Sequence, residues 1–117
     1  MKRIVILMGG LALVTPLHAD DSAAEAALAA VRDLGRVNGQ ALACGHADTA
    51  KWTRVLMLNH APKIRRYGEA FEEGTQESFV ALGREPGQCP DGSAIATRLE
   101  EVTQKLRTVL PVQPPEK

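Results

Sequence analysis

The stretch "GRVNGQALACG", residues 35–45, places two glycines four residues apart inside an alanine-rich segment with helical character. A glycine within a helix costs about 1 kcal/mol relative to alanine, so a compensating contact is expected. The simplest is a close backbone approach of a second helix at Gly35 and Gly39, as in helix pairs with small residues four apart. A bend or a ligand contact is the alternative. Gly45 suits the left-handed conformation that closes a helix, so Cys44 should be the last helical residue.

The helix that contains this stretch is predicted to begin at Ser22. Ser22 and Glu25 match a capping box, in which each side chain bonds the backbone amide of the other. Apolar and small residues then recur at helical spacing and define one buried stripe: Ala24, Ala27, Leu28, Val31, Leu34, Gly35, Asn38 and Leu42.

A second helix is predicted after this one, capped by Asp48 or Thr49 and ending at a joint near Pro62. Its expected buried face consists of Trp52, Val55 and Leu56, with Asn59 on the same side.

The third helix is predicted to run from Pro62 to Gly83. Its apolar stripe is expected to contain Ile64, Tyr67, Gly68, Phe71, Thr75, Ser78, Phe79 and Leu82. The opposite face is rich in glutamate and is expected to be exposed to solvent.

The fourth helix is predicted to start near Asp91 or Ser93 and to end before Pro111. Its seam has the spacing of a bundle helix: Ile95, Leu99, Val102, Leu106 and Val109. Residues 111–117 are expected to form a disordered tail.

The N-terminus has the pattern of a secretory signal peptide, residues 1–19. Lys2 and Arg3 precede an apolar run from Ile4 to Leu17, and Ala19 is a small residue at the expected cleavage site. The apolar run is shorter than the roughly 20 residues of a membrane span, so no span is expected after cleavage. An uncleaved anchor is the alternative.

Cleavage leaves 98 of the 117 residues, enough for one domain, predicted at residues 20–110. The remaining 12 basic and 14 acidic residues give a formal charge of −2. This balance argues against a general nucleic-acid binder, and no nucleic-acid partner is expected.

Two cysteines, Cys44 and Cys89, remain in the mature chain. In an exported protein such a pair predicts one disulfide, which here would join the loop before the fourth helix to the end of the first. Closing a loop of about 46 residues would stabilise the fold by roughly 4 kcal/mol in the chain-entropy model. A redox-active pair is the alternative, but that role favours two close cysteines. The sequence therefore predicts an all-α fold, a small four-helix bundle closed by one disulfide.

No motif for catalysis, a cofactor or a metal is recognisable in the sequence. The only mature histidines, His46 and His60, are fourteen residues apart and match no zinc-binding spacing. His60 is expected to be exposed at a helix end. We therefore expect a protein that is not an enzyme and that holds no cofactor or metal.

The one local feature that indicates a contact is a basic cluster at the start of the third helix: His60, Lys63, Arg65 and Arg66. Cations beside the exposed backbone amides of a helix N-terminus could bind a carboxylate, a phosphate or an acidic partner. Alternatively, these side chains pair with neighbouring glutamates or satisfy the last carbonyls of the second helix.

The tract "GRVNGQALACG…APKIRRYGEAFEEGTQESF" resembles small exported accessory proteins encoded with proteobacterial conjugation or type IV secretion systems. The overall arrangement is also similar in architecture to HdeA-type periplasmic chaperones. The first resemblance implies a non-enzymatic periplasmic protein that binds another protein. An acid-stress holdase and an immunity protein against a periplasmic toxin are alternatives, as is an enzyme or metal carrier. The sequence also leaves the formation of a homodimer undecided.

Overall fold

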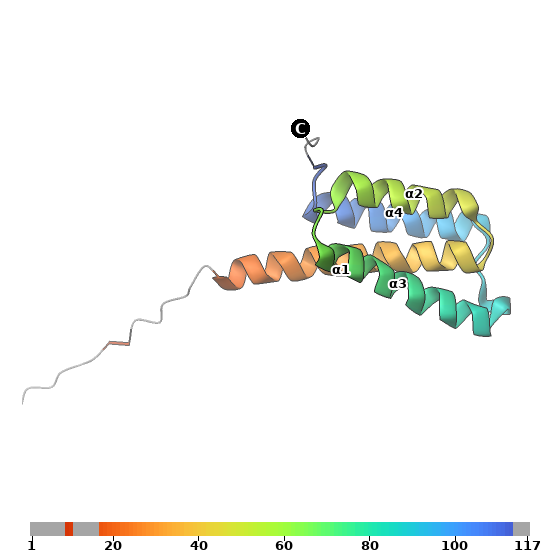
Figure 1. The fold of residues 1–117 in the computed structure, drawn as a ribbon, viewed down its shortest axis with the longest axis horizontal. Helices are drawn as coiled ribbons and strands as arrows, with labels where there is room; N and C mark the ends of the chain where they lie inside the picture. Colours follow the sequence, from red (N-terminus) through yellow and green to blue (C-terminus); the bar gives the residue numbers. More distant parts are fainter. Residues whose placement is uncertain (1–8, 11–16, 114–117) are drawn as a thin grey trace, which may run out of the picture.

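The computed structural model describes residues 9–10 and 17–113, which contain four α-helices and no strand (Figure 1). The all-α prediction is therefore confirmed for the described part of the chain. The elements, in chain order, are α1 (Leu17–Ala43), α2 (Ala47–His60), α3 (Arg65–Arg84), the short 3-10 turn η1 (Pro86–Gln88) and α4 (Gly92–Val109).

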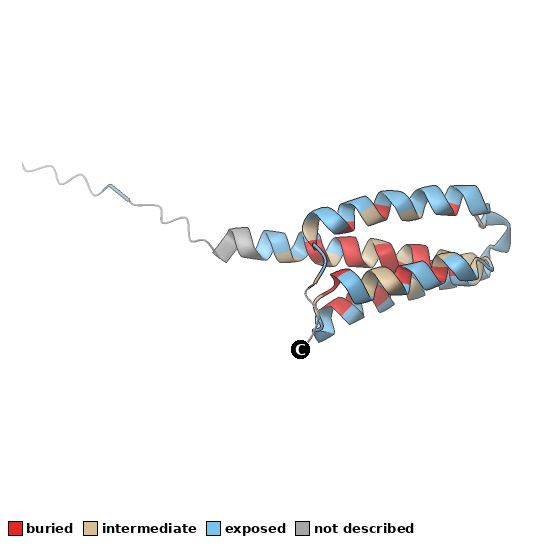
Figure 2. Ribbon diagram, turned by 90° about the horizontal axis from the view of Figure 1, so that it is seen from above, coloured by how far each residue is buried: buried red, intermediate tan, exposed pale blue. Residues whose placement is uncertain are grey.

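Helix α1 is the centre of the bundle. It packs against each of the other three helices, and α2 and α4 also pack on each other along one of its sides. Helix α3 lies on the other side, runs in the same direction as α1, and has at most a marginal contact with α2 or α4 (Figure 1). Buried residues accordingly gather along α1 (Figure 2). In a regular up-down-up-down bundle α3 would instead contact α2 and α4.

The N-terminal part of α1 extends beyond the other helices (Figure 1). Residues 21–26 are largely exposed, and from residue 21 onward the first buried residue is Ala27. The prediction that Ser22 caps this helix was wrong: no glycine or proline separates Leu17 from Ser22, so the helix extends back to Leu17. Of the predicted signal peptide, residues 1–8 and 11–16 lie outside the described residues.

Glycines lie where α1 and α3 cross. A Cβ atom added at Gly35 would overlap the carbonyl oxygen of Phe71, and one at Gly39 would overlap that of Thr75. On the facing helix, a Cβ at Gly74 would overlap the carbonyl oxygen of Arg32. The predicted close approach at Gly35 and Gly39 is thus confirmed, and Gly74 is its counterpart on α3.

Two ion pairs flank this crossing. Arg32 Nη2 lies 3.3 Å from Glu73 Oε2, and Arg36 Nε lies 3.2 Å from Glu77 Oε2. Arg36 also bonds Asp33 on its own helix at 2.6 Å. Partial burial opposes the charged form of Arg36, but the hydrogen bonds to Asp33 and Glu77 outweigh it, so its pKa is raised. These pairs lie beside the close approach of the two helices and connect α3 to α1 at the surface.

A short row of hydrogen bonds connects three helices near the same crossing. Asn38 Nδ2 of α1 donates to Thr75 Oγ1 of α3 at 3.1 Å. Thr53 Oγ1 of α2 lies 2.9 Å from Asn38 Oδ1 and 2.7 Å from the carbonyl oxygen of Ala50. Asn38 and Thr53 are buried, so this row satisfies polar atoms that would otherwise destabilise the core.

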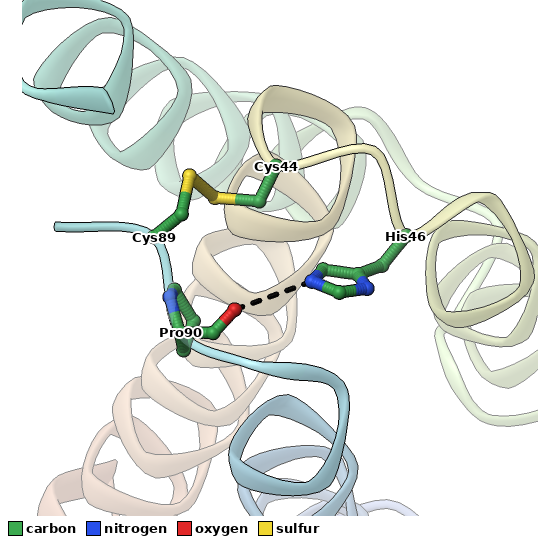
Figure 3. The surroundings of a disulfide bond; sticks show 4 residues. All are labelled: Cys44, His46, Cys89 and Pro90. Atoms are coloured by element: carbon green, nitrogen blue, oxygen red, sulfur yellow. Dashed lines mark hydrogen bonds between the residues drawn. A yellow bond between two sulfur atoms is a disulfide. The ribbon is translucent and has the colours of Figure 1, made fainter. Parts of the chain in front are cut away.

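The disulfide joins Cys44 to Cys89, whose Cα atoms are 5.6 Å apart (Figure 3). Helix α1 ends at Ala43, and Gly45 has a φ of 77°, the predicted left-handed residue that turns the chain. His46 Nε2 lies 3.2 Å from the carbonyl oxygen of Pro90, beside the disulfide (Figure 3). As predicted, the disulfide holds the loop before α4 across the end of α1.

Helix α4 matches its prediction. The Asp91 carboxylate accepts a hydrogen bond from the Ala94 amide at 2.8 Å and caps the helix. Ile95, Val102 and Leu106 are buried against the rest of the bundle. After α4, the amide of Gln113 donates to the Asn59 carbonyl at 2.8 Å. Of the predicted disordered tail, residues 114–117 lie outside the described residues.

The predicted face of α2 was only partly correct: Leu56 packs against the core and Val55 is half-buried, but Trp52 and Asn59 are exposed. The helix begins at Ala47, one residue before Asp48, and the N-cap is His46. Its buried residues are Ala50, Thr53 and His60, whereas Trp52 is 56% exposed. The residues predicted to be buried and the residues observed to be buried both have helical spacing. Ala50 and Thr53, which are smaller than Trp52, face the core, and the bulky Trp52 side chain lies outside.

The predicted stripe of α3 was too wide. Tyr67, Ala70, Phe71 and Gly74 are buried, but three predicted members are exposed: Ile64, Gly68 and Phe79. Because α3 packs mainly on the single helix α1, only a narrow strip of its surface is covered.

Candidate functional site

The four residues of the basic cluster predicted at the start of α3 differ in burial. His60 is 3% exposed, and its Nδ1 donates to the carbonyl oxygen of Leu110 at 2.7 Å. The expectation of an exposed His60 was wrong because the chain leaving α4 packs back onto the end of α2. The histidine therefore holds the two helix ends together.

The three cations of this cluster remain at the surface. Lys63 Nζ donates a hydrogen bond to the Leu58 carbonyl at 3.1 Å. For Lys63, this is the predicted alternative in which a cation bonds one of the last carbonyls of the second helix. The Arg66 guanidinium lies 5.8 Å from the ring centroid of Tyr67, within cation–π range. Arg65 is exposed on the outer side of α3. Anion binding by these residues stays a prediction.

A groove follows the seam between α2 and α4. It consists of two adjoining hollows of about 410 and 450 Å³ that share Trp52, Leu99, Thr103 and Arg107. We call it the Trp52 groove and define it by Trp52, Val55, Leu56, Leu99, Thr103 and Arg107. It is open because α3 lies on the opposite side of α1 (Figure 1).

Charges of opposite sign lie along the Trp52 groove. Asp48, in the first turn of α2, and Glu100 line the hollow nearer the start of both helices. Arg107, in the last turn of α4, lines both hollows, and Val112 lines the second one. The groove therefore has an apolar lining, an acidic end and a basic residue toward its other end.

A larger hollow of about 1070 Å³ lies on the outer side of α3. Its described lining residues all come from that one helix and include Phe71, Val80 and four glutamates. With no second described element facing it, this hollow is an open flank of a helix. The Trp52 groove has walls from two helices and is the better-formed candidate site, although it is smaller.

The described residues contain no group of three or more histidine, cysteine or acidic side chains placed to hold a metal ion. Both cysteines are in the disulfide. Among residues 9–10 and 17–113, no helix combines the length and apolar character that crossing a membrane requires.

The Trp52 groove could not be predicted while Trp52 was expected to lie in the core. One signal was available. In α2, apolar side chains occupy positions 52 and 55–58, and five such positions cover too much of a helix circumference to be buried together. At least one of them has to face outward.

Comparisons with known proteins give no further guide to this site: no family model, no curated protein and no solved structure matches the chain.

Proposed function

We propose that this chain is a non-enzymatic exported protein that binds another protein through the Trp52 groove. The observation that carries the proposal is the exposure of Trp52, the only tryptophan, over an apolar groove with two helical walls. Tryptophan is enriched among the residues that dominate the energy of protein–protein interfaces. Trp52 is 56% exposed, and a partner that covered this surface would gain binding energy from the hydrophobic effect.

The chemistry of the groove favours binding over catalysis. Apart from His60, its polar groups within the described chain are two threonine hydroxyls, side-chain amides and charges of both signs. His60 lines one hollow, but its Nδ1 is engaged by the Leu110 carbonyl. Such groups orient a bound surface, whereas hydrolytic chemistry needs an activated nucleophile beside a base.

The proposed location is the periplasm, after cleavage near Ala19. The signal-peptide pattern of residues 1–19 supports it, and so does a disulfide between Cys44 and Cys89, since disulfides persist in oxidising compartments. The resemblance to accessory proteins of conjugation and type IV secretion systems makes components of such systems the first partners to test.

The test is recovery of the partner by the periplasmic form of the protein, with Trp52→Ala as the variant and Phe79→Ala as the matched control. Both residues are exposed aromatics, at 56% and 49%, and lie on different helices. Truncating a central interface residue costs about 2 kcal/mol or more, so Trp52→Ala should weaken binding roughly 30-fold. Phe79→Ala should bind as the unaltered protein does.

Circular dichroism must show that both variants keep the helical fold. Equal recovery by Trp52→Ala and the unaltered protein would refute the proposal. A third variant with Lys63, Arg65 and Arg66 changed to glutamate tests the anion-site prediction separately, because these residues are not among those lining the Trp52 groove.

A further inference from the structure

The length of the Trp52 groove suits a helical segment. On α2 the lining residues extend from Asp48 to His60, which corresponds to about 18 Å of helix axis. That is about three turns. A helix of this length presents side chains at i, i+3 or i+4, and i+7 on one face, the spacing with which amphipathic helices occupy apolar grooves.

The topology of the bundle fixes the direction in which such a helix would fit. Helices α2 and α4 run the same way, opposite to α1 (Figure 1). In an up-down-up-down bundle, a helix packed on both would run antiparallel to them. Helix α3 does not take this place because it packs on the far side of α1.

The charges of the groove give the same direction. An antiparallel helix would have its last turn beside Asp48 and Glu100 and its first turn near Arg107. Basic residues in a last turn and acidic residues in a first turn also complement the helix dipole. The antiparallel orientation therefore pairs the charges of the bound helix with those of the groove and also complements the dipole of the bound helix.

We infer, as an extension of the proposed function, that the Trp52 groove binds an amphipathic α-helix of a partner protein, antiparallel to α2 and α4. The helix carries acidic residues in its first turn, an apolar stripe over Trp52 and Leu99, and basic residues in its last turn. Helix α3 of a second copy does not fit this description, because its first turn carries Arg65 and Arg66, of the same sign as Arg107.

The test uses two synthetic helical peptides without tryptophan that have the same composition and the same leucine stripe. One has glutamates in the first turn and lysines in the last turn, and the other has these charges exchanged. Because Trp52 is the only tryptophan, its fluorescence reports binding directly. The first peptide should bind about tenfold more tightly at low salt, with a smaller difference at high salt.

The charge-exchanged variant Glu100→Lys with Arg107→Glu separates the groove from the intrinsic stability of the peptides. Both residues are exposed, so the fold should persist. The ratio of the two affinities should fall by about tenfold or invert. An unchanged ratio would overturn the inferred direction, because the preference would then come from the peptides alone.

Three further outcomes would overturn the inference in distinguishable ways. If neither peptide binds while Trp52→Ala still loses the native partner, the partner element is not such a helix, although the proposed function stands. If the protein alone shifts its tryptophan emission on concentration and sediments as a dimer, a second copy covers the groove. If Trp52→Ala recovers the native partner normally, the proposed function itself fails.

Discussion

Replacing Gly74 by alanine would test the close approach of α1 and α3. The added Cβ would lie 2.9 Å from the backbone nitrogen of Arg36 and would overlap the carbonyl oxygen of Arg32. Closest contacts between carbon and carbonyl oxygen are about 3.3 Å, so the two helices would have to separate by about 1 Å. The obstructing atoms belong to the backbone, so no side chain can rotate out of the way.

The matched control is Gly68→Ala on the same helix. Gly68 is exposed, and a Cβ there would meet no atom within 4 Å, so alanine should stabilise the helix by about 0.5–1 kcal/mol. Gly74→Ala has the same propensity gain, opposed by an overpacking cost of about 1–3 kcal/mol. The difference in unfolding free energy between the two variants should therefore be about 1–3 kcal/mol, with Gly74→Ala the less stable.

Urea denaturation followed by circular dichroism, with the disulfide intact, measures this difference. Each kcal/mol also lowers the melting temperature by roughly 4–8 °C in a chain of this size. The double variant with Gly35→Ala should be less destabilised than the sum of the single variants, because one displacement of α3 relieves both overlaps. If Gly74→Ala were as stabilising as Gly68→Ala, the close approach would be refuted.

Three further outcomes are expected. Changing Cys44 and Cys89 to serine should lower the unfolding free energy by about 4 kcal/mol in the chain-entropy model, and an unchanged urea midpoint would contradict the role of the disulfide. The hydrogen bond from the Ala94 amide lowers the pKa of Asp91, so the unfolded chain binds this proton more tightly. The resulting stability is present above the ordinary pKa of about 4 and is lost as the pH falls through the lowered folded-state pKa. Asp91→Asn should make the stability less dependent on pH in that range, and an identical pH profile would argue against the cap. Finally, the pairs between α1 and α3 are exposed and worth roughly 0.2–1 kcal/mol each, so their loss at pH 3 should leave α3 docked and the fluorescence of the dye ANS low. A strong ANS increase with protection of client proteins would favour the acid-stress holdase instead.

Features set by local sequence could be predicted. The cap at Asp91 and the seam of α4 depend on residues within one helix, and the left-handed Gly45 depends on one turn. The disulfide could be predicted because only two cysteines remain in the mature chain. The close approach at Gly35 was also foreseeable, since an unfavourable residue within a helix indicates a tertiary contact.

Features that depend on contacts distant in sequence could not be predicted. The buried His60 donates a hydrogen bond to the Leu110 carbonyl, fifty residues later in the chain, and nothing in the sequence near His60 indicates that partner. Gly74 lies among glutamates and resembles a surface residue until it is placed opposite Arg32. The same reason applies to the candidate site: Trp52 is the bulkiest apolar residue of its helix, yet it lies outside the core.

The disulfide between Cys44 and Cys89 closes a covalent ring in the chain. Cys44 and Cys89 enclose α2, the joint at residues 61–64 and α3 within one ring. A protease that cuts this joint would produce two polypeptides, each with one half-cystine, that stay attached to each other. The nicked molecule would migrate as a single species until a reductant is added.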